Sequence, residues 1–198
     1  MAFIHIKEVL IMTNEQVEKI AELFHEYVFG DNTDYENLEY YLEELGIEIY
    51  YAEMDDADGY LRINSLSNNP RIVIKANQYA PRQRFTIAHE LGHLIWHYKF
   101  LPWKKKEWLN KFNNDEILSV TMYRGSNYSP NEKEKEQEAN AFAGAFLMPF
   151  SKIKTMIEEY MNMNDRKLKK SELIDLIVQE FKVSRPAATV RVNHLLGS

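Results

Sequence analysis

Apolar residues spaced three and four positions apart predict two helices in the first quarter of the chain. The first follows the helix-start signal Thr13-Asn14-Glu15 and continues to about Val28. The second covers Tyr35–Leu45 and ends at Gly46, because glycine readily takes the left-handed backbone conformation that follows many helices. The chain therefore opens with helices rather than strands.

The spacing of apolar residues then changes to that of β-strands. Three short runs at 47–51, 60–63 and 71–75 are rich in Ile, Val and Tyr, and Asp/Gly and Asn/Pro turn signals separate them. These runs predict a small, mainly antiparallel sheet. An exposed edge of such a sheet can bind an extended peptide as an added strand, and Arg71–Lys75 is the candidate edge strand.

Helical spacing returns for the rest of the chain. A buried helix is predicted over 80–98, and a charged first turn followed by apolar residues predicts another from Asn131 to Leu147, before Pro149. Residues 99–130 are predicted to form a surface excursion with one short helix. Further helices are predicted at 151–162, 171–181 and 185–196, so the fold class is α+β and mostly helical. The polar stretch Asn162–Lys170 is the candidate boundary between domains at 1–162 and 163–198.

The sequence His-Glu-Leu-Gly-His at residues 89–93 is the main candidate for chemistry. Two imidazoles four residues apart lie on one face of a helix, so His89 and His93 can each give one nitrogen to the same zinc ion. Glu90 lies about 100° around the helix, where its carboxylate can reach a water on the metal without binding the metal itself. The alternative is a pair of buried histidines satisfied by hydrogen bonds alone.

A third protein ligand is expected because catalytic zinc usually takes three. The chain has no cysteine, which leaves His, Asp and Glu. His97 would lie about 12 Å from His89 along a helix, too far for one ion, so it is expected to support a ligand or pack at the helix end. Glu136 extends the apolar face of the 131–147 helix, where a carboxylate without a partner is costly, and it is the predicted third ligand.

The neighbours of Glu136 on that helix are expected to have other roles. Asn140 lies one turn further along the same face and can orient a histidine ligand. Glu138 is expected to point to nearly the opposite side of the helix. Glu132 shares the face of Glu136 but stands in the first turn, where a carboxylate favours the helix dipole.

Composition limits the remaining possibilities. The 198 residues are 45% hydrophobic and carry a net charge of −6, which is typical of one globular core and argues against general nucleic-acid binding. The tail 152–198 has 9 Lys/Arg against 6 Asp/Glu, so local contact with DNA stays possible. No apolar run is long enough for a membrane span, and Ala2–Met12 lacks the features of a signal peptide. A cytoplasmic protein with no membrane partner is expected.

Two segments together resemble the ImmA/IrrE family of zinc metallopeptidases, a gluzincin-like group. The first runs from Arg82 to His93, and the second runs from Glu136 to Ala143 and resumes at Leu147-Met148-Pro149. The resemblance implies a zincin-like fold, and the glutamate of the second motif, here Glu136, completes the zinc site in such proteins. The segment between His93 and Glu136 is longer than usual in the family, so 99–130 is where this chain departs from it.

The resemblance also implies a substrate. Family members cleave transcriptional repressors of the helix-turn-helix type and so derepress stress or mobile-element genes. Related proteins often carry a helix-turn-helix segment as well. The sequence Phe181–Arg191 resembles such a segment, with Ser184 as the N-cap of the second helix. We expect this segment to pack on the catalytic core or contact the protein substrate, since Arg185 and Arg191 give little equipment for reading DNA bases.

The sequence therefore predicts a zinc endopeptidase, in which Mn²⁺ or Co²⁺ can replace Zn²⁺. Glu90 is the general base, and a second donor to the developing oxyanion is expected from one of four residues: Tyr98, Tyr123, Tyr128 or His97. The main alternative is a non-proteolytic transcription regulator or antirepressor that binds protein or DNA through its C-terminal helices. A zinc hydrolase of small molecules or cell-wall material is the third possibility.

Overall fold

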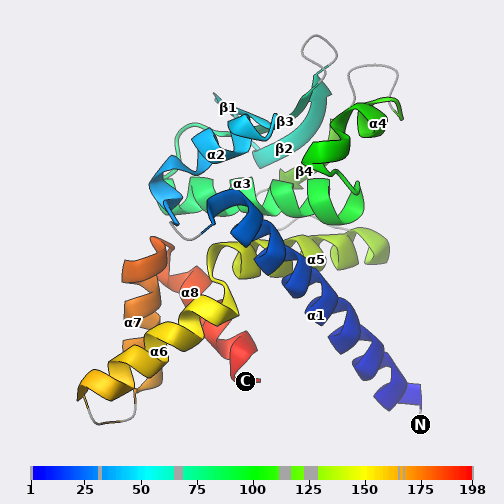
Figure 1. Ribbon diagram of the computed structural model, residues 1–198. Helices are drawn as coiled ribbons and strands as arrows, with labels where there is room; N and C mark the ends of the chain where they lie inside the picture. The colour runs from blue at the N-terminus through cyan, green and yellow to red at the C-terminus, as the bar shows by residue number, and fades with distance from the viewer. Residues whose placement is uncertain are drawn as a thin grey trace.

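The computed structural model describes residues 2–30, 33–64, 69–111, 117–122, 129–164, 166 and 168–197. A four-stranded sheet lies over a long helix, and a second long helix lies beneath that one (Figure 1). The helices between them and around them make the protein mostly helical, which confirms the predicted α+β class. None of the described helices is long and apolar enough to cross a membrane.

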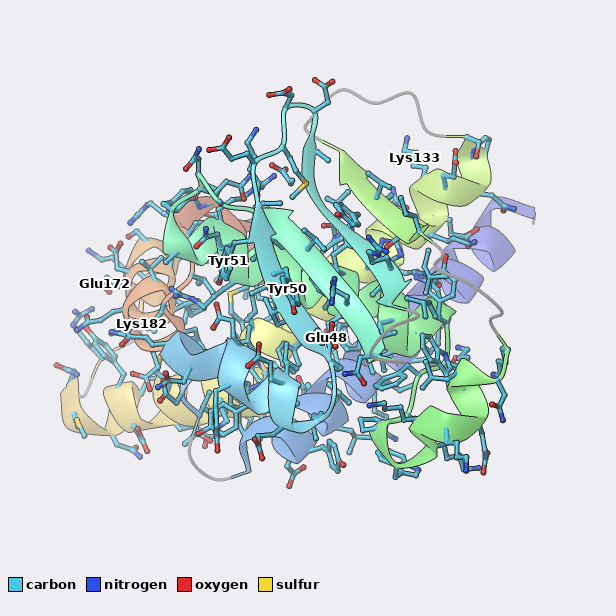
Figure 2. The ribbon with its side chains drawn as sticks, turned by 90° about the horizontal axis from the view of Figure 1, so that it is seen from above. Glu48, Tyr50, Tyr51, Lys133, Glu172 and Lys182 are labelled. Carbon is cyan, nitrogen blue, oxygen red and sulfur yellow. The ribbon has the colours of Figure 1, made fainter. Side chains whose placement is uncertain are left out.

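The sheet is mixed and mainly antiparallel. Its strands are β1 (Glu48–Ala52), β2 (Ala57–Asn64), β3 (Asn69–Lys75) and β4 (Ile117–Met122), in the order β1-β3-β2-β4. The β2–β3 and β2–β4 pairs are antiparallel, whereas β1 and β3 run parallel. Figure 2 looks down on the sheet and shows the β1 residues Tyr50 and Tyr51. One face of the sheet packs on the core with Ile49, Leu61, Ile63, Ile72 and Ile74.

Two predictions about the sheet were wrong. Arg71–Lys75 belongs to β3, which lies between β1 and β2, so it is not an edge strand. The edges are β1 and β4. β4 itself comes from the 99–130 segment, which was expected to contain only one short helix. That segment does hold the short helix α4 (Lys105–Leu109), but β4 adds to the sheet beside β2.

The helices α3 (Ala80–Gly92) and α5 (Pro130–Leu147) run antiparallel to one another and form the centre of the molecule (Figure 1). A π-helical turn, His93–His97, continues α3. α5 starts with a capping box, in which Ser129 and Glu132 each accept a hydrogen bond from the backbone N–H of the other. Glu132 therefore acts at the helix start, as predicted.

The remaining helices surround this pair. α1 (Ala2–Phe29) starts earlier than the predicted Thr13 and packs against α5. α2 (Leu38–Glu44) follows a short 3-10 turn, and Gly46 just after it has the positive φ of 74° expected there. The chain then ends in α6 (Phe150–Asn164), α7 (Lys170–Phe181) and α8 (Arg185–Leu195).

The C-terminal helices share the hydrophobic core of the rest of the molecule. Ile174, Ile177, Phe181, Ala188 and Val192 are buried in the same cluster as the apolar residues of α3 and α5. The division into 1–162 and 163–198 stays a prediction, and the helices on both sides of it pack together.

Candidate metal centre

Close packing of α3 on α5 brings the predicted metal ligands together. His89 and His93 lie on the face of α3 that meets α5, and both are almost fully buried. Between them Gly92 permits the contact, since a Cβ there would lie 3.1 Å from the Phe142 Cβ and 3.2 Å from the Ala139 Cα. The glycine of the motif is thus a requirement of helix packing.

The donor atoms of three side chains converge at this crossing. The Nε2 atoms of His89 and His93 are 3.2 Å apart, and each is also 3.2 Å from a different carboxylate oxygen of Glu136. A tetrahedral zinc ion with bonds of about 2.0–2.1 Å separates its ligand atoms by about 3.3 Å. The donor set and its dimensions therefore fit zinc. Among the residues that the structure describes, these three form the one group of His, Asp and Glu with metal-ligand spacing.

The charges at the cluster favour a cation. Burial lowers the pKa of His89, but the adjacent carboxylates of Glu136 and Glu90 outweigh it and raise that pKa above its ordinary value. Burial also raises the pKa of Glu136, but the adjacent imidazoles of His89 and His93 outweigh it and lower that pKa to about 2. The cluster therefore holds an ionised carboxylate that favours a positive charge beside His89.

The second nitrogen of His89 has the partner that the sequence predicted. Its Nδ1 lies 3.1 Å from the Asn140 Oδ1. The amide oxygen can only accept, so Nδ1 carries the proton and the Nε2 lone pair points to the cluster. Asn140 thus sets the tautomer that a metal ligand needs.

His93 is oriented through a chain of two further residues. The His93 Nδ1 is 3.0 Å from the His97 Nδ1, and the His97 Nε2 is 2.9 Å from the Glu138 Oε2. Burial lowers the pKa of His97 to about 4, so the ring is neutral at pH 7 and donates its Nε2 proton to Glu138. Its Nδ1 then accepts from the His93 Nδ1–H, which leaves the His93 Nε2 lone pair facing the cluster.

These contacts place His97 beside His93, where a supporting residue was expected, and they correct the expectation for Glu138. The helical-wheel argument turned Glu138 away from the site. In the structure the α3–α5 crossing and the reach of a glutamate side chain bring its carboxylate to His97, where it is largely buried. A wheel of one helix cannot show which neighbouring helix lies beside that flank.

Glu90 is held by two hydroxyl groups that were not predicted from the sequence. Ser119 donates to one carboxylate oxygen at 2.6 Å, and Thr121 donates to the other at 2.5 Å. Both residues lie on β4 and alternate with Val120, so they face α3 together. Their alternation is a strand signal, but it lay in the segment predicted to be a surface excursion.

The two described candidates for the second oxyanion donor, Tyr98 and His97, already have hydrogen-bond partners. Tyr98 donates its hydroxyl to the backbone oxygen of Leu118 in β4, and His97 is engaged by His93 and Glu138. Tyr123 and Tyr128 lie outside the described residues. Tyr98 thus fixes β4 beside the metal centre.

Two cavities meet at Glu136 and flank the metal centre. The smaller, of about 420 Å³, lies on the His93 side and is bordered by His97, Tyr98 and residues 117–120 of β4. The larger, of about 720 Å³, lies on the His89 side between α3, α5 and α8. A cleft with the metal centre between its two halves can hold a chain that extends past the site in both directions.

The arginines of the helix-turn-helix-like segment are occupied. Arg191 is 4% exposed, donates to the Met148 backbone oxygen and pairs with Glu18 at 2.8 Å. Arg185 pairs with Asp175 on α7. A buried, paired Arg191 cannot reach a DNA groove, so α8 is built to pack on the core.

One comparison with known proteins identifies relatives. A family model described as the IrrE N-terminal-like domain, peptidase family M78, matches residues 42–193. The match includes β1–β4, the metal centre and the C-terminal helices through most of α8. A search of curated proteins finds no match to the chain.

Proposed function

The chain belongs to the family of IrrE N-terminal-like domains, a family of metallopeptidase type, and from that premise we propose that it is a zinc-dependent endopeptidase. Its substrate would be a helix-turn-helix transcriptional repressor, cleaved in the cytoplasm to derepress stress or mobile-element genes. The observation that carries the catalytic part is the convergence of His89, His93 and Glu136: the two Nε2 atoms are 3.2 Å apart, and each lies 3.2 Å from one of the two Glu136 carboxylate oxygens.

In this proposal the two imidazoles and the carboxylate hold Zn²⁺ and leave its fourth position open. When bound, the ion would polarise the scissile carbonyl and acidify a water molecule. Mn²⁺ and Co²⁺ fit a set of two nitrogens and one carboxylate as well. Asn140 and the His97–Glu138 pair keep both imidazoles in the tautomer that offers Nε2.

Glu90 moves the proton. Its carboxylate takes a proton from the attacking water and later gives that proton to the leaving amine nitrogen. Ser119 and Thr121 hold the carboxylate in place before the substrate binds. An intact general base is unnecessary in a purely structural zinc site, which supports hydrolysis over a non-enzymatic role.

β4 supplies the place for the substrate backbone. It is an edge strand, it borders the smaller cavity, and Ser119 and Thr121 on it touch Glu90. An extended peptide that pairs with this edge passes directly beside the metal centre. This moves the predicted strand-addition site from Arg71–Lys75 to Ile117–Met122.

The repressor as substrate rests on the family resemblance, and the C-terminal helices add support against the alternative. An antirepressor that read DNA through α8 would need several exposed cations there, whereas Arg191 is buried and ion-paired and the exposed Arg185 is paired with Asp175. A contact between α8 and a protein substrate fits these observations better.

The test is to mix the zinc-loaded protein with helix-turn-helix repressors from the same organism, beginning with any that is encoded beside its gene, and to follow cleavage on a gel. We expect cleavage that a chelator stops and zinc restores. Glu90→Gln should bind zinc like the wild type and cleave at least about 10³-fold more slowly, because its amide cannot accept the proton. Undiminished cleavage by Glu90→Gln would contradict the mechanism, and loss of repressor binding to its operator without cleavage would favour the antirepressor.

A further inference from the structure

The larger of the two cavities lies between the metal centre and the C-terminal helix α8. It begins at His89 and Glu136 and is closed on one side by α8. Its lining includes six apolar or side-chain-free positions, Phe85, Ala141, Gly144, Met148, Ala187 and Val190, together with uncharged polar residues such as Thr86, Gln137 and Ser184. Val190 is 68% exposed although it is apolar, and it stands on the rim that α8 provides.

The charged groups around this cavity already have partners. Arg82 pairs with the buried Asp58. Glu18 pairs with Arg191 at 2.8 Å and with His194 at 2.6 Å. Among the described lining residues, Glu136 is the remaining charged group, and it faces the two ligand histidines. A charged side chain that entered the cavity would therefore be buried without a partner, which costs free energy. An apolar side chain would be stabilised there, because its surface would be removed from water.

The floor of the cavity is open because of one glycine. A Cβ added at Gly144 would meet only the Arg191 Cδ, at 3.9 Å, so there is free space above this position of α5. Gly144 lies two turns from Glu136 on the same helix. The depth of the cavity beside the metal centre thus depends on the absence of a side chain here.

We propose that this cavity is the subsite for a large apolar side chain, of the size of leucine or larger, on the substrate residue next to the scissile bond. The C-terminal pair α7–α8 is then a part of substrate recognition, with α8 as the wall of the subsite. Figure 2 shows that Lys182, just after α7, and Lys133, near the start of α5, lie on opposite sides of the molecule. Residues of α8 line the cavity directly, and α7 supports α8 from behind. The inference rests on the proposed zinc peptidase function and adds its specificity.

The experiment measures binding to the zinc-loaded protein and needs no known substrate. The probes are N-acetyl-leucine hydroxamate and N-acetyl-glycine hydroxamate, which share the zinc-binding group and differ in one side chain. Titration calorimetry of the wild type should give an affinity at least about tenfold higher for the leucine probe, the expected gain from burying that side chain. Zinc loading of each protein is checked first by equilibrium dialysis.

Two variants assign the preference to this cavity. Gly144→Leu fills the floor and should remove most of the preference while the Kd of the glycine probe stays within about twofold of the wild type. Val190→Asp places a charge on the α8 wall and should also reduce the preference. Leu196→Asp is the matched control, since Leu196 is 58% exposed and lies outside the cavity lining; it should keep the wild-type preference.

The binding experiment distinguishes failure of the proposed function from failure of the subsite. A wild-type protein that binds no zinc would contradict the proposed function, and the subsite with it. Zinc-loaded protein that binds both probes equally would contradict the subsite alone. A leucine preference that survives in Gly144→Leu would place the side chain in the smaller cavity and would also overturn the inference.

Discussion

At the scale of single residues, the metal centre depends on hydrogen bonds that hold two imidazoles in one tautomer. His89 is held by Asn140, and His93 is held by His97, which is held in turn by Glu138. Partners of this kind tune metal affinity strongly although they do not touch the metal. The site therefore has to be tested beyond its three ligands.

We predict that His97→Leu lowers zinc affinity by roughly 10–100-fold, because the His93 Nδ1–H then loses its acceptor. His97→Gln, whose amide oxygen can still accept, should recover part of the loss. Competition with a chromophoric chelator measures both values. His194→Leu removes a half-exposed histidine that pairs with Glu18 and has no contact with His93, and it should bind zinc like the wild type; equal affinity in His97→Leu would rule out the proposed role.

We also predict that the double variant Ser119→Ala/Thr121→Val lowers kcat about tenfold and leaves zinc affinity unchanged. Both hydroxyls donate to Glu90, and hydrogen bonds to a charged group are worth about 1.5–3 kcal/mol. Steady-state kinetics of repressor cleavage measures the effect on kcat, and the chelator titration measures the effect on zinc affinity. A fall in zinc affinity of the same size as the fall in kcat would mean that the hydroxyls serve the fold of the whole site.

The residues of the centre were predictable to different degrees. The spacing within single helices predicted the roles of His89, His93, Glu136 and Asn140, because helical geometry places residues i and i+4 on one face. Ser119, Thr121 and Glu138 were missed because their roles depend on which strand or helix lies alongside. That information is in the packing of separate elements, and no local spacing carries it.

At the scale of elements, the distance between α3 and α5 decides whether Glu136 reaches the histidines. Gly92 lies at the contact, where a Cβ would press on the backbone of Ala139 at 3.2 Å. Backbone atoms of a packed helix yield little, so an added methyl group would push the helices apart.

We predict that Gly92→Ala lowers the free energy of unfolding by about 1–3 kcal/mol and weakens zinc binding, since overpacking costs energy of this size. Gly144→Ala is the matched control on α5, where the added Cβ has its nearest neighbour at 3.9 Å. It should be neutral or stabilise by up to about 1 kcal/mol through higher helix propensity. Urea denaturation measures both, and equal effects of the two substitutions would remove the packing argument.

The elements themselves were easier to predict than their arrangement. Strong periodicity identified α3, α5 and three strands, and the turn at Gly46 followed from glycine chemistry. The order of the strands was not predictable in this way, because β3 pairs with β1 in parallel and with β2 antiparallel and so becomes central. β4 was missed because its short run stands between polar segments and joins the sheet from far along the chain.

At the scale of the whole molecule, one buried histidine links α1 to α5. His25 is 2% exposed, and its Nδ1 donates to the backbone oxygen of Phe146 on α5 at 2.7 Å. Its Nε2 lies 3.2 Å from the Thr33 hydroxyl. Burial lowers the pKa of His25 from 6.5 to about 4.

We predict that this histidine makes the fold sensitive to acid. Its folded-state pKa is below its unfolded value, so the unfolded chain binds more protons, and stability is lost as the pH falls from about 6.5 toward 4. The gap corresponds to about 3 kcal/mol. Urea denaturation of the metal-free protein across this range should show that His25→Gln has a shallower loss than the wild type. Parallel curves for the two proteins would contradict the prediction.

The account as a whole depends on one cation held by His89, His93 and Glu136 with a position left for solvent. Crystals grown with zinc, with anomalous diffraction recorded on both sides of the zinc absorption edge, test this most directly. We predict a single strong peak about 2.0–2.2 Å from both Nε2 atoms and a Glu136 oxygen, with a non-protein ligand completing the coordination. No peak there, or a fourth protein side chain closing the site, would contradict the account.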